Sequence, residues 1–168
     1  MRGAAAVAAI FLALAAQTTL SRYVFRSSTP IDLVLIIVVY VGIKSGPVTG
    51  LLAGTVAGLI QDALAGGVLG IGGLAKTLVG FMSGVLGTQF IVSAPLPRFV
   101  LLLMATAMHA AVFMGLYGLL DLRHFPSPYE GVAWQALGNA VVGLFGFQVF
   151  EWIPGFVDRR RAGRFLRR

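Results

Sequence analysis

The sequence predicts an all-α protein that forms a polytopic membrane bundle of about six transmembrane helices. Three observations lead to this fold class: 58% of the residues are apolar, only 11% are charged, and the apolar residues fall into separated runs. Soluble domains are about 45–50% apolar and about 25% charged. Six acidic and thirteen basic side chains are too few to cover the surface of a soluble domain of 168 residues. The chain is therefore expected to lie in a lipid bilayer.

Glycine, proline and charged residues separate the apolar runs. The predicted spans are Gly3–Leu20, Ile31–Ile43, Val48–Leu64, Leu74–Ser93, Phe99–Leu120 and Val132–Trp152, the last ended by Pro154-Gly155. The first run also resembles a secretory signal peptide. Because the rest of the chain is equally hydrophobic, we expect a retained helix instead.

The second run, Ile31–Ile43, is short for a membrane span. As a helix it is about 20 Å long, whereas the hydrocarbon layer is about 30 Å thick. This segment must therefore recruit flanking residues, lie where the bilayer is thin, or insert only partly.

Basic residues predict the orientation of the chain. Six of them lie at the C-terminal end: Arg159, Arg160, Arg161, Arg164, Arg167 and Arg168. Because basic residues concentrate on the cytoplasmic side, and six spans place both ends on one side, we expect both termini in the cytoplasm. Arg2, Lys44 and Arg98 then lie inside, and Arg22, Arg26 and Arg123 outside.

The same charge distribution suggests a division of the chain. We expect a single transmembrane domain over residues 1–157 and a basic cytoplasmic tail over residues 158–168. A cluster of arginines beside a span is typical of binding to anionic lipid headgroups. It does not indicate a nucleic-acid partner.

Small residues recur at helical spacing in the third and fourth runs. Gly50, Gly54 and Gly58 lie in one run, and Gly80 and Gly84 in the next. This spacing lets helix backbones approach closely in lipid, so these glycines are predicted helix-packing residues. The pattern fits packing within the protein and binding of a partner helix equally well.

Three ionisable residues fall inside the predicted spans: Asp32, Asp62 and Lys76. Such groups cost at least about 2.5–3.5 kcal/mol near the bilayer centre on insertion scales. The topology places all three near the outer face, as candidates for a pocket or a partner contact. One glycine-rich turn separates Asp62 from Lys76, which predicts a buried ion pair. Solvation of both groups at the interface is the alternative.

Enzyme chemistry has little support in the sequence. There is no cysteine and there are two histidines, so no metal site is expected. The run from Gly70 to Thr77 nearly matches a phosphate-binding loop, but Ala75 replaces its glycine and no strand precedes it. We expect no cofactor and no nucleotide.

A second enzyme-like pattern is the order Ser83 then His109, which evokes an intramembrane serine protease. The motif would need glycine where Phe81 stands. His109 is therefore expected to be packed between helices or to form hydrogen bonds between them, and Asn139 and Gln148 are likewise expected to join helices. No catalytic residues are predicted.

Four motifs in order carry a family resemblance: Pro30-Ile31-Asp32-Leu33, Lys44-Ser45-Gly46-Pro47, the run GLIQDAL at residues 58–64, and Lys76-Thr77-Leu78-Val79-Gly80. With them, residues 30–84 resemble MreD, a family of bacterial rod shape-determining membrane proteins. The second half of the chain matches that family in hydropathy and length only. In the glycine-rich turn, Val68 and Gly72-Gly73 stand where proline or asparagine is common in the family.

The resemblance implies a non-enzymatic scaffold of the elongation complex in the bacterial cytoplasmic membrane, supporting side-wall peptidoglycan synthesis and rod shape. The implied partners are an MreC-like bitopic membrane protein, a RodA-type glycosyltransferase with its transpeptidase, and an MreB-type filament. The family is also similar to the six-helix substrate-binding subunits of energy-coupling-factor transporters. The alternative function is therefore a small-solute (vitamin-type) binding subunit, with Asp32, Asp62 and Lys76 lining its pocket.

Overall fold

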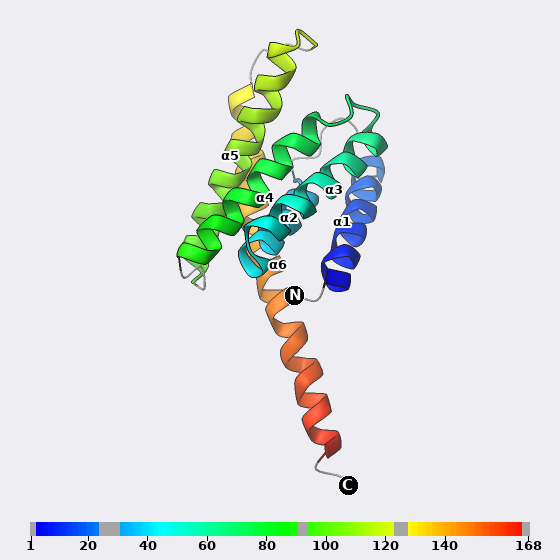
Figure 1. Cartoon of the computed structure of the whole chain (residues 1–168), viewed down its shortest axis with the longest axis vertical. Coiled ribbons are helices and arrows are strands. Elements are labelled where there is room, and N and C mark those ends of the chain that lie inside the picture. Colours follow the sequence, from blue (N-terminus) through cyan, green and yellow to red (C-terminus); the bar gives the residue numbers. More distant parts are fainter. Residues whose placement is uncertain (1–2, 24–30, 91–93, 123–127, 166–168) are drawn as a thin grey trace.

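The computed structural model describes residues 3–23, 31–90, 94–122 and 128–165, which form six helices and no strand (Figure 1). The helices are α1 (Gly3–Tyr23), α2 (Leu33–Ser45), α3 (Pro47–Ala65), α4 (Ile71–Gln89), α5 (Pro95–Leu119) and α6 (Pro128–Phe165). Successive helices run in alternate directions, so α1 starts and α6 ends on the same side of the bundle (Figure 1). The prediction of an all-α helical bundle is confirmed.

Four helices are long and apolar enough to cross a membrane. They are α3, α4, α5 and the Tyr129–Val149 part of α6. Within the described residues, Ala6–Thr19 of α1 and all of α2 are shorter apolar helices.

Helix α2 is the centre of the bundle. Its sequence is apolar on every side, which is typical of a helix surrounded by protein, and residues 34–42 are all buried. It contacts each of the other five helices. Because protein encloses this helix, its length does not have to match the thickness of the hydrocarbon layer.

Two apolar clusters lie on opposite faces of α2. Val34, Ile37, Val38 and Val41 face α1 and α3. Leu35, Ile36, Val39 and Tyr40 face α4, α5 and α6. Both sets follow the helical spacing of three and four residues, so α2 joins the two halves of the core.

Helices α3 and α4 pack backbone against backbone. A Cβ atom at Gly58 would lie 2.6 Å from Gly73 Cα, and one at Gly54 would collide with the Lys76 carbonyl oxygen. Gly50 and Gly80 face each other so closely that neither has room for a side chain. Such contacts let helices associate tightly where lipid gives no hydrophobic driving force.

Gly84 belongs to the same contact region, because a Cβ atom there would collide with the backbone of Pro47 at the start of α3. All five glycines that the sequence singled out therefore lie at helix contacts inside the protein.

Two helices begin at a proline that precedes the predicted start. Helix α5 begins at Pro95, before the predicted Phe99, and α6 begins at Pro128. Proline is favoured in the first turn of a helix, where its missing N–H has no partner in any case. The extra residues lengthen both helices at these ends.

The prediction that Pro154-Gly155 ends the last helix is wrong, because α6 continues to Phe165. Proline removes a hydrogen bond from the ladder and crowds the carbonyl of residue i−4, so it disfavours a helix interior, but its fixed φ is a helical value. Arginine is a good helix former, so the basic segment that follows can extend the helix. The last part of α6 projects away from the other helices (Figure 1).

The C-terminal arginines fall partly within this extension. The backbone at Arg159, Arg160, Arg161 and Arg164 is helical, whereas Arg167 and Arg168 lie outside the described residues. Their contact with lipid headgroups stays a prediction.

The sequence predicts that Arg98 lies in a loop on the cytoplasmic side, but in the structure its side chain is buried. The residue lies in the first turn of α5. Its guanidinium group is 5.2 Å from the centre of the Phe147 ring on α6. A cation over an aromatic face is a favourable contact when water is excluded, so Arg98 helps to join α5 to α6.

Candidate functional site

An ion pair joins α2 to α4 inside the bundle. Lys76 Nζ lies 2.7 Å from Asp32 Oδ2, and the two side chains are only 4% and 5% exposed. The other carboxylate oxygen of Asp32 accepts a hydrogen bond of 3.0 Å from the Leu35 amide. Asp32 therefore caps the N-terminus of α2 and neutralises Lys76 at the same time.

Lys76 also contacts α5. Its Nζ lies 3.0 Å from His109 Nε2. An ammonium group can only donate, so Nε2 accepts and the proton of the neutral ring resides on Nδ1. That Nδ1 atom is buried and has no hydrogen-bond partner among the described residues. The imidazole ring stacks on Phe113, one turn along α5.

Asn139 connects α6 to the same place. Its side-chain oxygen accepts a 2.7 Å hydrogen bond from the Asp32 amide, and its side-chain nitrogen donates over 3.1 Å to Thr106 Oγ1. The Thr106 hydroxyl donates to the Leu102 carbonyl oxygen at 2.9 Å. We call Asp32, Lys76, Thr106, His109 and Asn139 the polar cluster. It links α2, α4, α5 and α6.

Asp62 is not part of this cluster. Its Oδ2 accepts hydrogen bonds from the amides of Gly70 at 2.9 Å and Gly73 at 3.0 Å. The predicted ion pair between Asp62 and Lys76 is therefore wrong. The glycine-rich turn brings the free amides at the start of α4 onto Asp62, whereas Lys76 lies one turn further along and reaches α2.

The amides at the start of α4 are also relevant to the run from Gly70 to Thr77, which nearly matches a phosphate-binding loop. Free amides at a helix N-terminus attract anions, and here the Asp62 carboxylate occupies them. The Thr77 hydroxyl donates to the Gly73 carbonyl oxygen and lies 2.7 Å from Thr55 Oγ1 on α3. The turn thus binds a carboxylate of its own chain.

The three ionisable candidates separate into two places. Asp32 and Lys76 meet in the polar cluster, whereas Asp62 lies at the turn between α3 and α4. His109, the partner of Lys76, lies in the middle part of α5. The ion pair therefore lies at the N-terminal end of α2 and in the second turn of α4, beside the middle part of α5.

Sequence reasoning found part of this cluster. The prediction that His109 and Asn139 form hydrogen bonds between helices is confirmed. Gln148, for which the same was predicted, has an exposed side chain instead. Thr106 was missed, although its spacing from His109 places both on one face of a helix.

Ser83 has no role in this cluster. It is buried on α4, seven residues beyond Lys76, which is about 10 Å along a helix. His109 Nε2 contacts Lys76 instead. The positions of these residues therefore give no support to the protease-like pattern.

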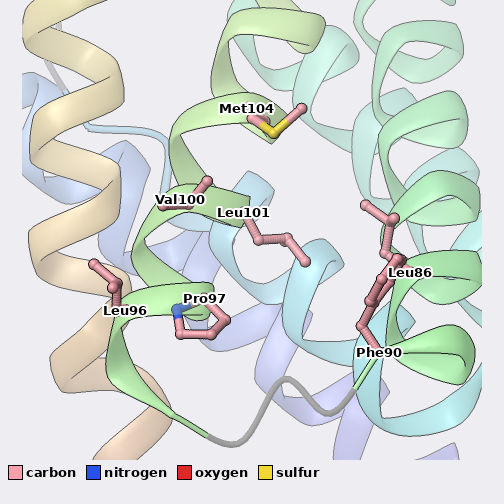
Figure 2. Close-up of a pocket in the computed structure, with 7 residues that line it drawn as sticks. All are labelled: Leu86, Phe90, Leu96, Pro97, Val100, Leu101 and Met104. Atoms are coloured by element: carbon pink, nitrogen blue, oxygen red, sulfur yellow. The ribbon is translucent and has the colours of Figure 1, made fainter.

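An apolar groove opens between α4 and α5 (Figure 2). It has a volume of about 460 Å³ and is lined by Leu86, Phe90, Leu96, Pro97, Val100, Leu101 and Met104. A second groove of about 410 Å³ is lined by residues of α3, α4 and α5: Leu51, Leu74, Thr77, Leu78, Phe81 and Val112. Asp32, Asp62 and Lys76 line neither of them.

These features define a helical membrane protein whose buried charged groups bind one another and so join its helices. The family model of the rod shape-determining protein MreD matches residues 4–152. The chain therefore belongs to the MreD family, and it is a membrane protein of the machinery that determines cell shape. No curated protein and no solved structure matches the chain.

Proposed function

We propose that this member of the MreD family is a non-enzymatic membrane scaffold of the bacterial elongation complex. In this proposal it binds the transmembrane helix of an MreC-like bitopic partner and so supports side-wall peptidoglycan synthesis and rod shape. A RodA-type glycosyltransferase, its transpeptidase partner and an MreB-type filament are the further partners.

The observation that carries the proposal is a stripe of small residues on the outer face of α5. Ala107, Ala111, Gly115 and Gly118 are all exposed and recur at helical spacing. A Cβ atom added at either glycine would meet no other atom within 4 Å. We call these four residues the α5 stripe.

Small residues on a helix face let a second helix approach closely in lipid. The predicted packing glycines of α3 and α4 already face backbone atoms of the protein, whereas the α5 stripe is open. Exposed Val100 and Met104 continue the same face toward the groove of Figure 2. This face suits a partner that has a single transmembrane helix.

The test is co-purification with the MreC-like partner in mild detergent. The variant Ala111→Leu/Gly115→Leu fills the α5 stripe and should lose most of the partner. The matched control is Gly131→Leu on α6, where an added Cβ atom also meets no atom within 4 Å. It should retain the partner. Equal recovery of partner with both variants would contradict the proposed surface.

Cell shape provides the functional test. Depletion of the protein should turn rods into spheres. The Gly131→Leu variant should restore rods, and the variant with a filled α5 stripe should not. Unchanged shape after depletion would contradict a role in elongation.

The location belongs to the proposal as well. We place the protein in the cytoplasmic membrane with both termini inside, supported by the alternating helix directions (Figure 1) and the basic C-terminal end. The arginines of that end would contact anionic lipids. A purified monomer that binds a vitamin-type solute tightly would favour the alternative function.

A further inference from the structure

The bundle consists of two parts that are held together in different ways. In the first part, α1–α4, the backbones of α2, α3 and α4 touch: besides the α3–α4 contacts, a Cβ atom at Gly42 of α2 would lie 2.7 Å from the Gly80 carbonyl oxygen. A Cβ atom at Gly87 of α4 would lie 2.6 Å from Ile43 Cα. These contacts show that the backbones of α2, α3 and α4 are closely packed against one another.

The second part, the hairpin of α5 and α6, makes no such contacts at four of its glycines. Added Cβ atoms at Gly115, Gly118, Gly131 and Gly146 meet no atom within 4 Å. At Gly143 the neighbours are side-chain atoms of Leu102 and Ile36. The hairpin therefore contacts α2 and α4 through apolar side chains, and the groove of Figure 2 opens between α4 and α5.

Within the polar cluster, two hydrogen bonds cross between the parts. Lys76 of α4 binds His109 of α5, and the Asp32 amide donates to Asn139 of α6. Apolar contact between helices brings no hydrophobic driving force in a bilayer, so interhelical hydrogen bonds and close packing position the helices. The close backbone contacts described above all lie in the first part, so these two bonds, together with a longer one of 3.4 Å from the Val68 amide to the Tyr117 hydroxyl of α5, have a large share in positioning the hairpin.

The charges of the cluster stay paired without the hairpin. Asp32 and Lys76 both belong to the first part, and their ion pair closes at 2.7 Å. Movement of the hairpin would break the two hydrogen bonds of the polar cluster but leave Asp32 and Lys76 paired with each other. In addition, the buried Nδ1 of His109 lacks a hydrogen-bond partner among the described residues. An unsatisfied buried donor is unfavourable, so this atom lowers the stability of the closed arrangement.

We propose that the α5–α6 hairpin is a movable unit that is latched to α1–α4 by the Lys76–His109 and Asp32–Asn139 hydrogen bonds. Release of this latch widens the apolar groove between α4 and α5. The inference is independent of which partner binds the α5 stripe, because it rests on contacts within the chain alone.

The chain has no cysteine, so pairs of spin labels can be attached at introduced cysteines without background. Labels at Met82→Cys and Ala111→Cys report the α4–α5 distance in lipid nanodiscs by electron paramagnetic resonance. Labels at Leu52→Cys and Met82→Cys report the α3–α4 distance and serve as the control, because glycine contacts hold that pair. All three positions have exposed side chains.

The test variant is His109→Phe/Asn139→Leu, which removes both crossing bonds of the polar cluster and leaves the Asp32–Lys76 pair and the Val68–Tyr117 hydrogen bond. We expect the α4–α5 distances to gain a longer component while the α3–α4 distances stay unchanged. His109→Gln, which keeps an acceptor for Lys76, should retain the single α4–α5 distance of the unaltered cluster.

Three outcomes would overturn the latch. Unchanged α4–α5 distances in the double variant would show that apolar packing alone holds the hairpin. Broadening of both label pairs would show that the bundle loosens as a whole. An α4–α5 change in His109→Gln as large as that in the double variant would show that ring shape matters and the hydrogen bond does not.

Discussion

Asp32 Oδ2 and Lys76 Nζ lie 2.7 Å apart, so an ion pair connects the N-terminal cap of α2 to the second turn of α4. Both side chains are buried. Loss of one member of a buried pair leaves an uncompensated charge, which costs far more than the pair itself contributes. Each member of the pair is therefore needed to compensate the buried charge of the other.

Replacing Lys76 by methionine should lower the free energy of unfolding by about 3–5 kcal/mol, because it isolates the Asp32 carboxylate. Asp32→Leu should be similarly harmful. The double variant Asp32→Leu/Lys76→Met removes both charges. Its free energy of unfolding should therefore decrease by clearly less than the sum of the two single decreases. Reversible unfolding in mixed detergent measures all three values.

A second double-mutant cycle, with Asp62→Asn and Lys76→Met, provides the comparison for the Asp32–Lys76 cycle. Asp62 binds the amides of Gly70 and Gly73 and not Lys76. The decreases in the free energy of unfolding caused by these two substitutions should be close to additive. Strong coupling in this cycle and additivity in the first would contradict the observed pairing.

Gly54→Ala should destabilise the protein by about 1–3 kcal/mol, as overpacking of a filled contact generally does. The new methyl group would collide with the carbonyl oxygen of Lys76 on α4. Thermal unfolding in detergent measures the effect.

The matched control for that substitution is Gly115→Ala, because a Cβ atom there meets no other atom within 4 Å. Alanine is favoured over glycine in a helix by roughly 0.5–1 kcal/mol, so this variant should be neutral or slightly more stable. Equal destabilisation by both substitutions would contradict close packing at Gly54.

Asp62→Ala should loosen the start of α4, since it leaves the amides of Gly70 and Gly73 without their acceptor. Loss of such a cap typically costs about 0.5–2 kcal/mol. Hydrogen exchange at these amides should become faster, while exchange in α2 stays as before. Asp62→Asn keeps one acceptor oxygen and should have an intermediate effect; faster exchange spread evenly over the bundle would argue against a local cap.

Cysteine labelling checks the orientation. Val68, in the turn between α3 and α4, and Ala94, before α5, are both exposed. With both termini inside, a membrane-impermeant maleimide should label Val68→Cys in right-side-out vesicles and reach Ala94→Cys only after permeabilisation. The reverse pattern would invert the proposed topology.

The glycine patterns show where sequence reasoning reaches its limit. Gly54 on α3 and Gly115 on α5 are both small residues at helical spacing, yet the first faces the backbone of α4 and the second meets open space. Spacing determines which residues share a helix face. It does not determine what that face meets.

The short second run is a similar case. The sequence predicted a helix of this length, and α2 has it. Only the assembled bundle explains why a short helix is tolerated, because the five surrounding helices, and not lipid, contact it.

The sequence by itself determined the all-α membrane class, the approximate spans and the MreD resemblance, because composition and local hydrophobic runs decide these properties. It also identified Asp32, Asp62 and Lys76 as residues needing partners. Only the tertiary structure decided that Lys76 pairs with distant Asp32 and not with nearby Asp62. The physical reason is that a buried charge binds the partner that helix packing brings into contact, and packing depends on which faces of separate helices fit together.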